Sequence, residues 1–178
     1  MTLTVVYAAD TGHVVGALAL TGADAPADVA ALVGDALPLR VPLGGGRTVT
    51  LPLNARALAA AIVDGEPDAL TDPLAFGVEP TSAGAPGPAL LRLAGWSGGD
   101  GIALATDGLT VTVPVAANRP AGVVALVSDG QDTRVLAGEI PAQQVRVKLP
   151  VTLDQGGTYG VLALVAGWAG RLEKAVVT

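Results

Sequence analysis

The sequence has no cysteine, a single histidine and only 3% aromatic residues. Without cysteine, the chain forms no disulfide, performs no thiol chemistry and builds no cysteine-ligated zinc site. One histidine, His13, leaves a Ser-His-Asp triad or a histidine-based metal centre without enough parts in one chain. We therefore expect a protein that is not an enzyme and that holds no cofactor.

Charged residues are also scarce, at 15% of the 178 residues against a usual share of about 25%. Residues 1–80 contain three arginines and nine acidic residues, and so account for the whole net charge of −6. Residues 81–178 contain seven basic and seven acidic residues. No stretch forms a basic patch, so nucleic acid is not an expected partner.

Long apolar runs are absent too, although hydrophobic residues make up 51% of the chain. No run reaches the roughly 18 residues that a membrane-spanning helix needs. The first residues, Met1 to Thr4, lack the basic start of a signal peptide. These features predict a soluble, acidic, cytoplasmic protein that does not insert into a membrane.

A soluble chain with so few charges must cover its outer surface with other groups. One explanation is that partner subunits cover part of it, in a homo- or hetero-oligomer. The other is a GC-rich genome, which raises alanine, glycine and proline and also explains eight arginines against two lysines. The sequence leaves both explanations open.

The first half of the chain predicts two hairpins and one short helix. Residues 2–7 and 13–20 flank a turn signal and form the first predicted hairpin. Residues 37–43 and 47–53 flank three glycines and form the second, with leucine and valine alternating on one face. The helix is expected between them, in residues 24–34, because Pro26 suits a first helical turn and Gly34 an end.

Three prolines mark the second hairpin as an exposed element. Pro38, Pro42 and Pro52 cannot donate a backbone hydrogen bond to a neighbouring strand. The two strands are therefore expected at a sheet edge, or with the proline side toward solvent. Residues 55–63 fit a helix or a strand, and we favour a strand or extended chain.

Residues 81–88 contain only small residues and chain breakers, and predict a linker between two units. The preceding unit, residues 1–80, is expected to be acidic and rich in β-structure. In the following unit, residues 89–178, eight short strands with regular turn signals predict an antiparallel β-sandwich. The strands are expected at 89–96, 101–105, 109–115, 122–127, 133–137, 143–149, 159–166 and 171–177.

A turn that leads to a tyrosine and then to an apolar strand organises the second unit. Leu153, Gly156 and Tyr159 are followed by five residues, 161–165, that suit a strand buried on both faces. A buried tyrosine at the start of such a strand can bond backbone a few residues upstream. The alternative is that Tyr159 is an ordinary tyrosine of an all-β fold and makes no such bond.

This pattern resembles that of fibronectin type III and related immunoglobulin-like domains. In that family a leucine, two or three turn residues and a glycine precede the tyrosine that opens the penultimate strand. The resemblance covers about residues 88–178 and implies a mainly β fold with an immunoglobulin-like sandwich. The chain departs from the family in having no inter-sheet disulfide and no tryptophan in the apolar strand 123–127.

The triplet Asp10-Thr11-Gly12 is the one that carries the catalytic carboxylate in aspartic proteases. Here it lies at the start of the chain, His13 follows it, and no flap is recognisable. A hairpin turn explains the triplet better than a hydrolase site does. We expect His13, beside that turn, at the surface or at a sheet edge.

Acidic residues gather near the end of the first predicted unit. Asp64, Glu66 and Asp68 offer oxygen ligands at alternate positions, as a calcium loop does, with Asp72 close behind. The closing glutamate of a full calcium loop is missing, so a solvated linker is the favoured interpretation.

Trp96 and Trp168 are the candidate binding residues. Each follows a glycine in the loosely repeated segments 93–96 and 165–168. An exposed tryptophan can stack on a sugar ring or seat a protein partner. The alternative, which we favour, is that both close the ends of the core.

We therefore expect a non-enzymatic structural or adaptor component of a larger protein assembly, such as a phage-tail-like or secretion particle. Partner subunits would bind its sheet faces and its edge strands. The main alternative is a carbohydrate- or ligand-binding accessory module that uses Trp96, Trp168 and the acidic loop.

Overall fold

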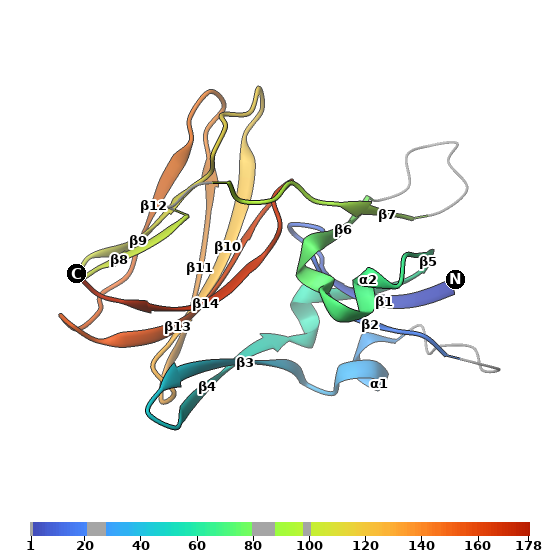
Figure 1. Ribbon diagram of the computed structural model, residues 1–178, viewed down its shortest axis with the longest axis horizontal. Helices are drawn as coiled ribbons and strands as arrows, with labels where there is room; N and C mark the ends of the chain where they lie inside the picture. Colours follow the sequence, from blue (N-terminus) through green and yellow to red (C-terminus); the bar gives the residue numbers. More distant parts are fainter. Residues whose placement is uncertain (1, 21–27, 80–87, 98–100) are drawn as a thin grey trace.

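The fold is mainly β, as the sequence predicts, and the described residues contain two short α-helices where one was expected. The computed structural model describes residues 2–20, 28–79, 88–97 and 101–178 (Figure 1). Figure 1 shows strands β8 to β14 on one side and the first strands of the chain on the other, with the β3–β4 hairpin beneath. No helix in the described part of the chain is long and apolar enough to cross a membrane.

The first sheet holds three antiparallel strands in the order β2-β1-β5. They are β1 (Thr2–Ala8), β2 (Val14–Leu18) and β5 (Leu58–Asp64). One face of this sheet packs in a core with Phe76 and Val78, and the other face packs in a second core with residues of the β3–β4 hairpin. The elements nearest the first face are α2 (Asp68–Thr71), the 3-10 turn η2 (Pro73–Ala75), β6 (Phe76–Glu79) and β7 (Ala89–Arg92).

The predicted helix is α1 (Val29–Val33), and it ends at Gly34 as expected. Its N-cap is Asp28, whose carboxylate accepts a hydrogen bond from the Ala30 N–H at 3.1 Å. A side-chain oxygen at this position satisfies one of the free N–H groups of the first turn. The start that we expected at Asp24 or Ala25 lies outside the described residues.

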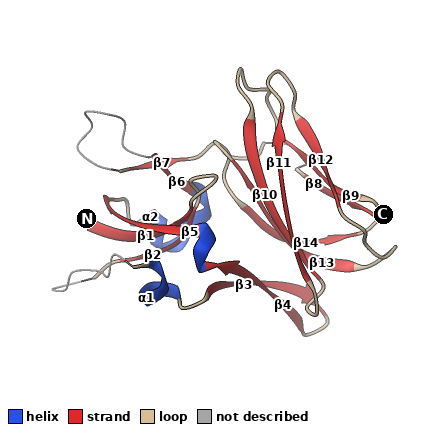
Figure 2. Cartoon of the chain, turned by 180° about the vertical axis from the view of Figure 1, so that it is seen from behind, coloured by secondary structure: helices blue, strands red, loops and turns tan. Residues whose placement is uncertain are grey.

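The second half of the chain forms two antiparallel sheets that face each other (Figure 2). One sheet has the order β12-β9-β8, with β8 (Ile102–Ala105), β9 (Gly108–Thr112) and β12 (Arg146–Pro150). The other has the order β11-β10-β13-β14, with β10 (Ala121–Ser128), β11 (Thr133–Ile140), β13 (Thr158–Val165) and β14 (Arg171–Val176). Alternate residues of both sheets, including Leu109, Val111, Ala125 and Val161, fill the core between them.

Tyr159 lies at the mouth of β13, and its hydroxyl accepts a hydrogen bond from the Asp154 N–H at 3.2 Å. Leu153 is buried in the same core. The turn between them needs glycine twice. Gly156 has φ = +71°, and a Cβ on Gly157 would lie 2.7 Å from the Tyr159 ring.

The hairpin of β3 (Ala36–Gly44) and β4 (Arg47–Asn54) covers β10, β13 and β14 on the outer face of the β11-β10-β13-β14 sheet. Its buried side chains, among them Val41, Val49 and Leu51, share one core with Leu126, Leu162 and Leu164 of that sheet. All residues of β13 after Thr158 are therefore buried. Odd-numbered residues face the inter-sheet core and even-numbered residues face the hairpin.

The hairpin joins the two halves of the chain, because it belongs to residues 1–80 but packs on the second half. The strand that we expected at 89–96 also differs from prediction. Residues 89–92 form β7, which pairs with β6 in the first half and not with either sheet of the second. Residues 81–87 of the predicted linker lie outside the described residues.

The close approach of the hairpin to β13 gives a first testable prediction. A Cβ on Gly160 would lie 3.2 Å from a methyl group of Val49 and 3.3 Å from Val41, so Gly160→Val should push the hairpin outward. We expect a loss of about 1–3 kcal/mol in the free energy of unfolding, measured by urea denaturation.

Gly122→Val is the matched control, because Gly122 lies in the same sheet and a Cβ added there would have no other atom within 4 Å. It should change stability by less than half as much. Equal losses for the two variants would contradict the packing described here.

Candidate functional site

The two glycine–tryptophan segments meet in the structure. Ala94 and Trp168 form an isolated parallel bridge, in which the Ala94 N–H donates to the Gly167 carbonyl at 3.2 Å. The Ala169 N–H donates back to the Ala94 carbonyl at 2.8 Å. The loose repeat in the sequence therefore marks two segments that lie side by side.

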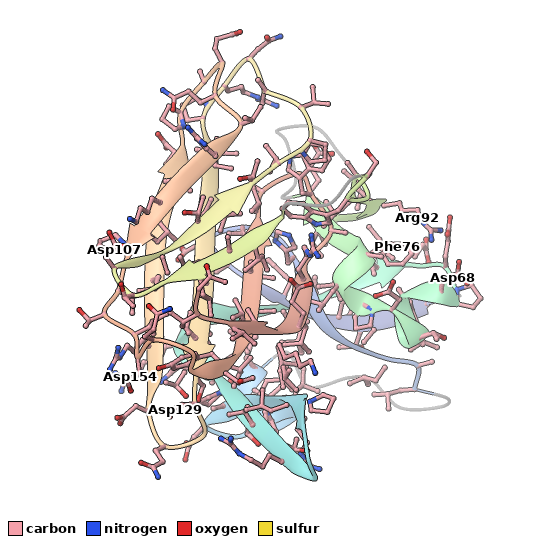
Figure 3. The ribbon with its side chains drawn as sticks, turned by 60° about the vertical axis from the view of Figure 1, so that its left-hand side comes forward. Asp68, Phe76, Arg92, Asp107, Asp129 and Asp154 are labelled. Atoms are coloured by element: carbon pink, nitrogen blue, oxygen red, sulfur yellow. The ribbon has the colours of Figure 1, made fainter. Side chains whose placement is uncertain are left out.

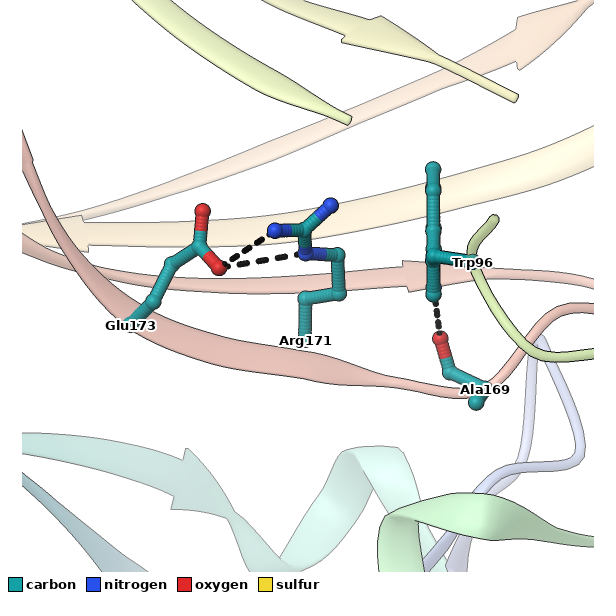
Figure 4. A network of polar contacts seen from close by, with 4 residues as sticks. All are labelled: Trp96, Ala169, Arg171 and Glu173. Carbon is teal, nitrogen blue, oxygen red and sulfur yellow. Dashed lines mark hydrogen bonds and ion pairs between the residues drawn. The ribbon is translucent and has the colours of Figure 1, made fainter. Parts of the chain in front are cut away.

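The two indole rings pack on each other at the end of the inter-sheet core. The ring centroids of Trp96 and Trp168 are 5.9 Å apart, and the rings are tilted by 45°. Both side chains are half-buried, and the Trp96 Nε1–H donates to the Ala169 carbonyl at 2.6 Å (Figure 4). This arrangement satisfies the polar atom of Trp96 and fits a role in closing the core.

A charged pair borders the tryptophans. The Arg171 guanidinium lies 5.2 Å from the centroid of the Trp96 ring, within the range of a cation–π contact. The same side chain donates two hydrogen bonds to one carboxylate oxygen of Glu173, at 2.8 and 3.1 Å (Figure 4). The cation is therefore held by Trp96 on one side and by Glu173 on the other.

His13 is fully buried, so of its two expected places the surface was wrong. It directly precedes β2, which is an edge strand of its sheet. Its Nε2 lies 2.7 Å from the Trp168 carbonyl and its Nδ1 lies 2.9 Å from the Thr11 hydroxyl. Since a carbonyl only accepts, Nε2 carries the proton and donates to Trp168. His13 thus connects the first turn of the chain with the tryptophan turn of the second half.

Burial keeps this imidazole neutral. Desolvation lowers the pKa of His13 below its ordinary value of 6.5, and it outweighs the hydrogen bonds to the backbone of Trp168 and of Thr11, which favour the charged form. In the neutral form, Nδ1 accepts a hydrogen bond from the Thr11 hydroxyl. The sequence feature that could have indicated the burial of His13 is the apolar stretch that begins directly after it, at Val14.

An open pocket of about 510 Å³ lies beside Trp168. Its lining includes Trp168, Gly167 and Ala94 together with Arg119 and Pro120. Trp96 is not among its lining residues. The pocket therefore combines one aromatic side chain with one cation, and the second tryptophan contacts the first without lining the pocket.

The acidic candidates do not converge on a metal. Asp64, Glu66 and Asp68 are all exposed, and no three acidic or histidine side chains in the described residues form a metal-binding group. Asp68 instead lies 3.5 Å from Arg92, whose guanidinium sits 5.4 Å from the centroid of the Phe76 ring (Figure 3). The pair between Asp68 and Arg92 is mostly solvent-exposed, so it adds little stability.

Asp10 is exposed in the turn between β1 and β2. Gly12, with φ = +77°, accepts the Val78 N–H at 2.8 Å through its carbonyl, and the Gly12 N–H donates to Ala8. The triplet therefore serves as a hairpin turn that also binds β6. In the described residues, Asp10 belongs to no group of three or more acidic or histidine side chains that could hold a metal.

Comparison with known proteins gives no relative, because no family model, curated protein or solved structure matches this chain.

The burial of His13 gives a prediction about pH. The pKa of His13 in the folded state lies below 6.5. Just below pH 6.5, His13 is therefore protonated more in the unfolded chain than in the folded chain. Stability is therefore complete above pH 6.5 and falls as the pH falls. We expect the free energy of unfolding to decrease between pH 7.5 and 5.5, measured by urea denaturation.

His13→Gln is the test variant, because its amide can still donate to the Trp168 carbonyl but does not titrate. Since His13 is the only histidine, this variant should show almost no change in stability over the same pH range. A variant that keeps the full pH dependence would show that another group causes it.

Proposed function

We propose that the protein is a non-enzymatic structural or adaptor component of a larger assembly, in a phage-tail-like or secretion particle. Its partners are other protein subunits, which it binds through sheet faces and edge strands. The proposed location is the cytoplasm. The observation that carries the proposal is the β3–β4 hairpin, a two-stranded sheet with two edges and no third strand among the described residues.

An unpaired edge offers backbone N–H and C=O groups to a strand of another chain. One exposed apolar side chain lies on the face of the neighbouring sheet that carries the hairpin. Val135 of β11 lies opposite Leu126 of β10, so both side chains are on the same face of the sheet. The hairpin covers Leu126 on that face. It leaves the Val135 side chain 68% exposed. A single exposed apolar side chain is common on protein surfaces, so the free edges of the hairpin carry the proposal.

We also propose that residues 101–178 form a fibronectin type III-like or immunoglobulin-like module. The seven strands β8 to β14 support this, since three form one sheet and four form the other. The hydrogen bond from the Asp154 N–H to the Tyr159 hydroxyl provides further support, together with Gly156 and Gly157 in the turn before Tyr159. Such modules serve many functions, so the class alone does not define the partner.

The assembly proposal is tested on the native protein. Gentle lysis of the cells that make it, followed by size-exclusion chromatography, should place the chain in a complex several times heavier than its own 17.5 kDa. Elution as a free chain, with no heavier fraction, would overturn the proposal.

The second candidate is a carbohydrate- or ligand-binding accessory module, and the pocket beside Trp168 favours it. A sugar ring can stack on the indole while Arg119 bonds its hydroxyl or carboxylate groups. On a glycan array, Trp168→Ala should abolish binding by a folded protein. Trp96→Phe should retain it, because Trp96 does not line the pocket. An array with no bound glycan for the unaltered protein would exclude this candidate.

A further inference from the structure

We propose that the free edge of β4 pairs with the same edge of a second copy of this chain, centred on Val49. The inference rests on the proposed assembly function and names one of its contacts. The carrying observation is the register of the β3–β4 hairpin, which determines which backbone groups point outward.

Antiparallel pairs alternate between residues that exchange two hydrogen bonds and residues that exchange none. Pro38 lies opposite Pro52. Because proline has no N–H, this pair is one of the second kind. The alternation then makes Arg40 opposite Thr50 a second such pair, and both point their backbone groups away from the partner strand.

The two edges of the hairpin therefore differ. On β3 the outward positions include Pro38 and Pro42, so only Arg40 between them offers an N–H. On β4 they are Thr48 and Thr50, which each offer an N–H and a C=O, and then Pro52. Prolines on an edge strand are a common protection against pairing. This hairpin has that protection on β3 and lacks it over the first half of β4.

The β4 edge is complementary to itself. In an antiparallel pair with a two-fold axis at Val49, Thr48 lies opposite Thr50 of the second copy. Each of these pairs exchanges two N–H···O=C bonds, which uses every outward donor of Thr48 and Thr50 in both chains. Pro52 then lies opposite Gly46 in the turn, where its missing N–H breaks no bond. The threonine side chains also lie opposite each other, a favourable pairing on a sheet surface.

The side chains along the β4 edge are exposed to solvent. Thr48, Thr50 and Pro52 are all exposed. In Figures 1 and 2 the hairpin lies along the lower rim of the molecule. β4 contacts β10 and β13 while β3 contacts β13 and β14, so the free edge of β4 is on the β10 side of that sheet. The only charged residue of β4 is Arg47, which would lie opposite Leu51 of the second copy. No like charges meet directly across the proposed ladder.

The test compares proline substitutions on the two edges. Thr50→Pro removes one outward N–H from β4, at a position of the kind where Pro38 and Pro52 are already tolerated. Arg40→Pro is the matched control, since Arg40 is the cross-strand neighbour of Thr50 and lies on the other edge. Thr50→Val, which alters the side chain but keeps the N–H, is a second control. Circular dichroism verifies the fold of each variant.

Sedimentation velocity over a concentration series should show the unaltered chain shifting from 17.5 kDa toward twice that mass. Thr50→Pro should weaken this association at least tenfold, while Arg40→Pro and Thr50→Val should retain it. In hydrogen-exchange NMR, the Thr48 and Thr50 amides should become protected only at concentrations where the dimer forms.

Two results would overturn the inference. A folded Thr50→Pro that associates as strongly as the unaltered chain would remove β4 from the interface and leave the assembly proposal standing. A chain that remains monomeric at the highest concentration would exclude the second copy as occupant. If the native protein is nevertheless found in a large complex, the edge then belongs to a different partner.

Discussion

The burial of β13 on both faces is the constraint on which the structure depends. Tyr159 and Val161 face the core between the two sheets, while Leu162 and Leu164 face the β3–β4 hairpin. A strand in the outer sheet of a two-layer protein would expose every second residue to water. Here the hairpin supplies a third layer, so residues from the first half of the chain complete the packing of the second half.

Local patterns explain why most of the strands could be predicted. In 47–53, leucine and valine alternate with exposed residues, and the buried and exposed positions follow that alternation. The continuous apolar run 161–165 indicated burial on both sides, and β13 has that burial. Glycine and proline marked the turns because they restrict or extend the backbone angles in ways that the structure uses, as at Gly156 and Pro38.

Contacts between distant segments could not be predicted in this way. Nothing in the residues 36–54 says that they lie on β13 or that β7 pairs with β6, because pairing partners are determined by the packing of the whole chain. For the same reason His13 was misplaced, since its partner, the Trp168 carbonyl, is 155 residues away. Trp96 and Trp168 were singled out separately, and only the fold brings their rings together.

Native-state hydrogen exchange tests most directly whether the two halves form one cooperative unit. Backbone amides of Val41 and Val49, which face each other inside the hairpin, and those of Val161 and Ala163 in β13 should exchange with the same free energy and the same dependence on denaturant. Hairpin amides that exchange at a much lower free energy than those of β13 would contradict the account, because the hairpin would then open while the sheet that it covers stays folded.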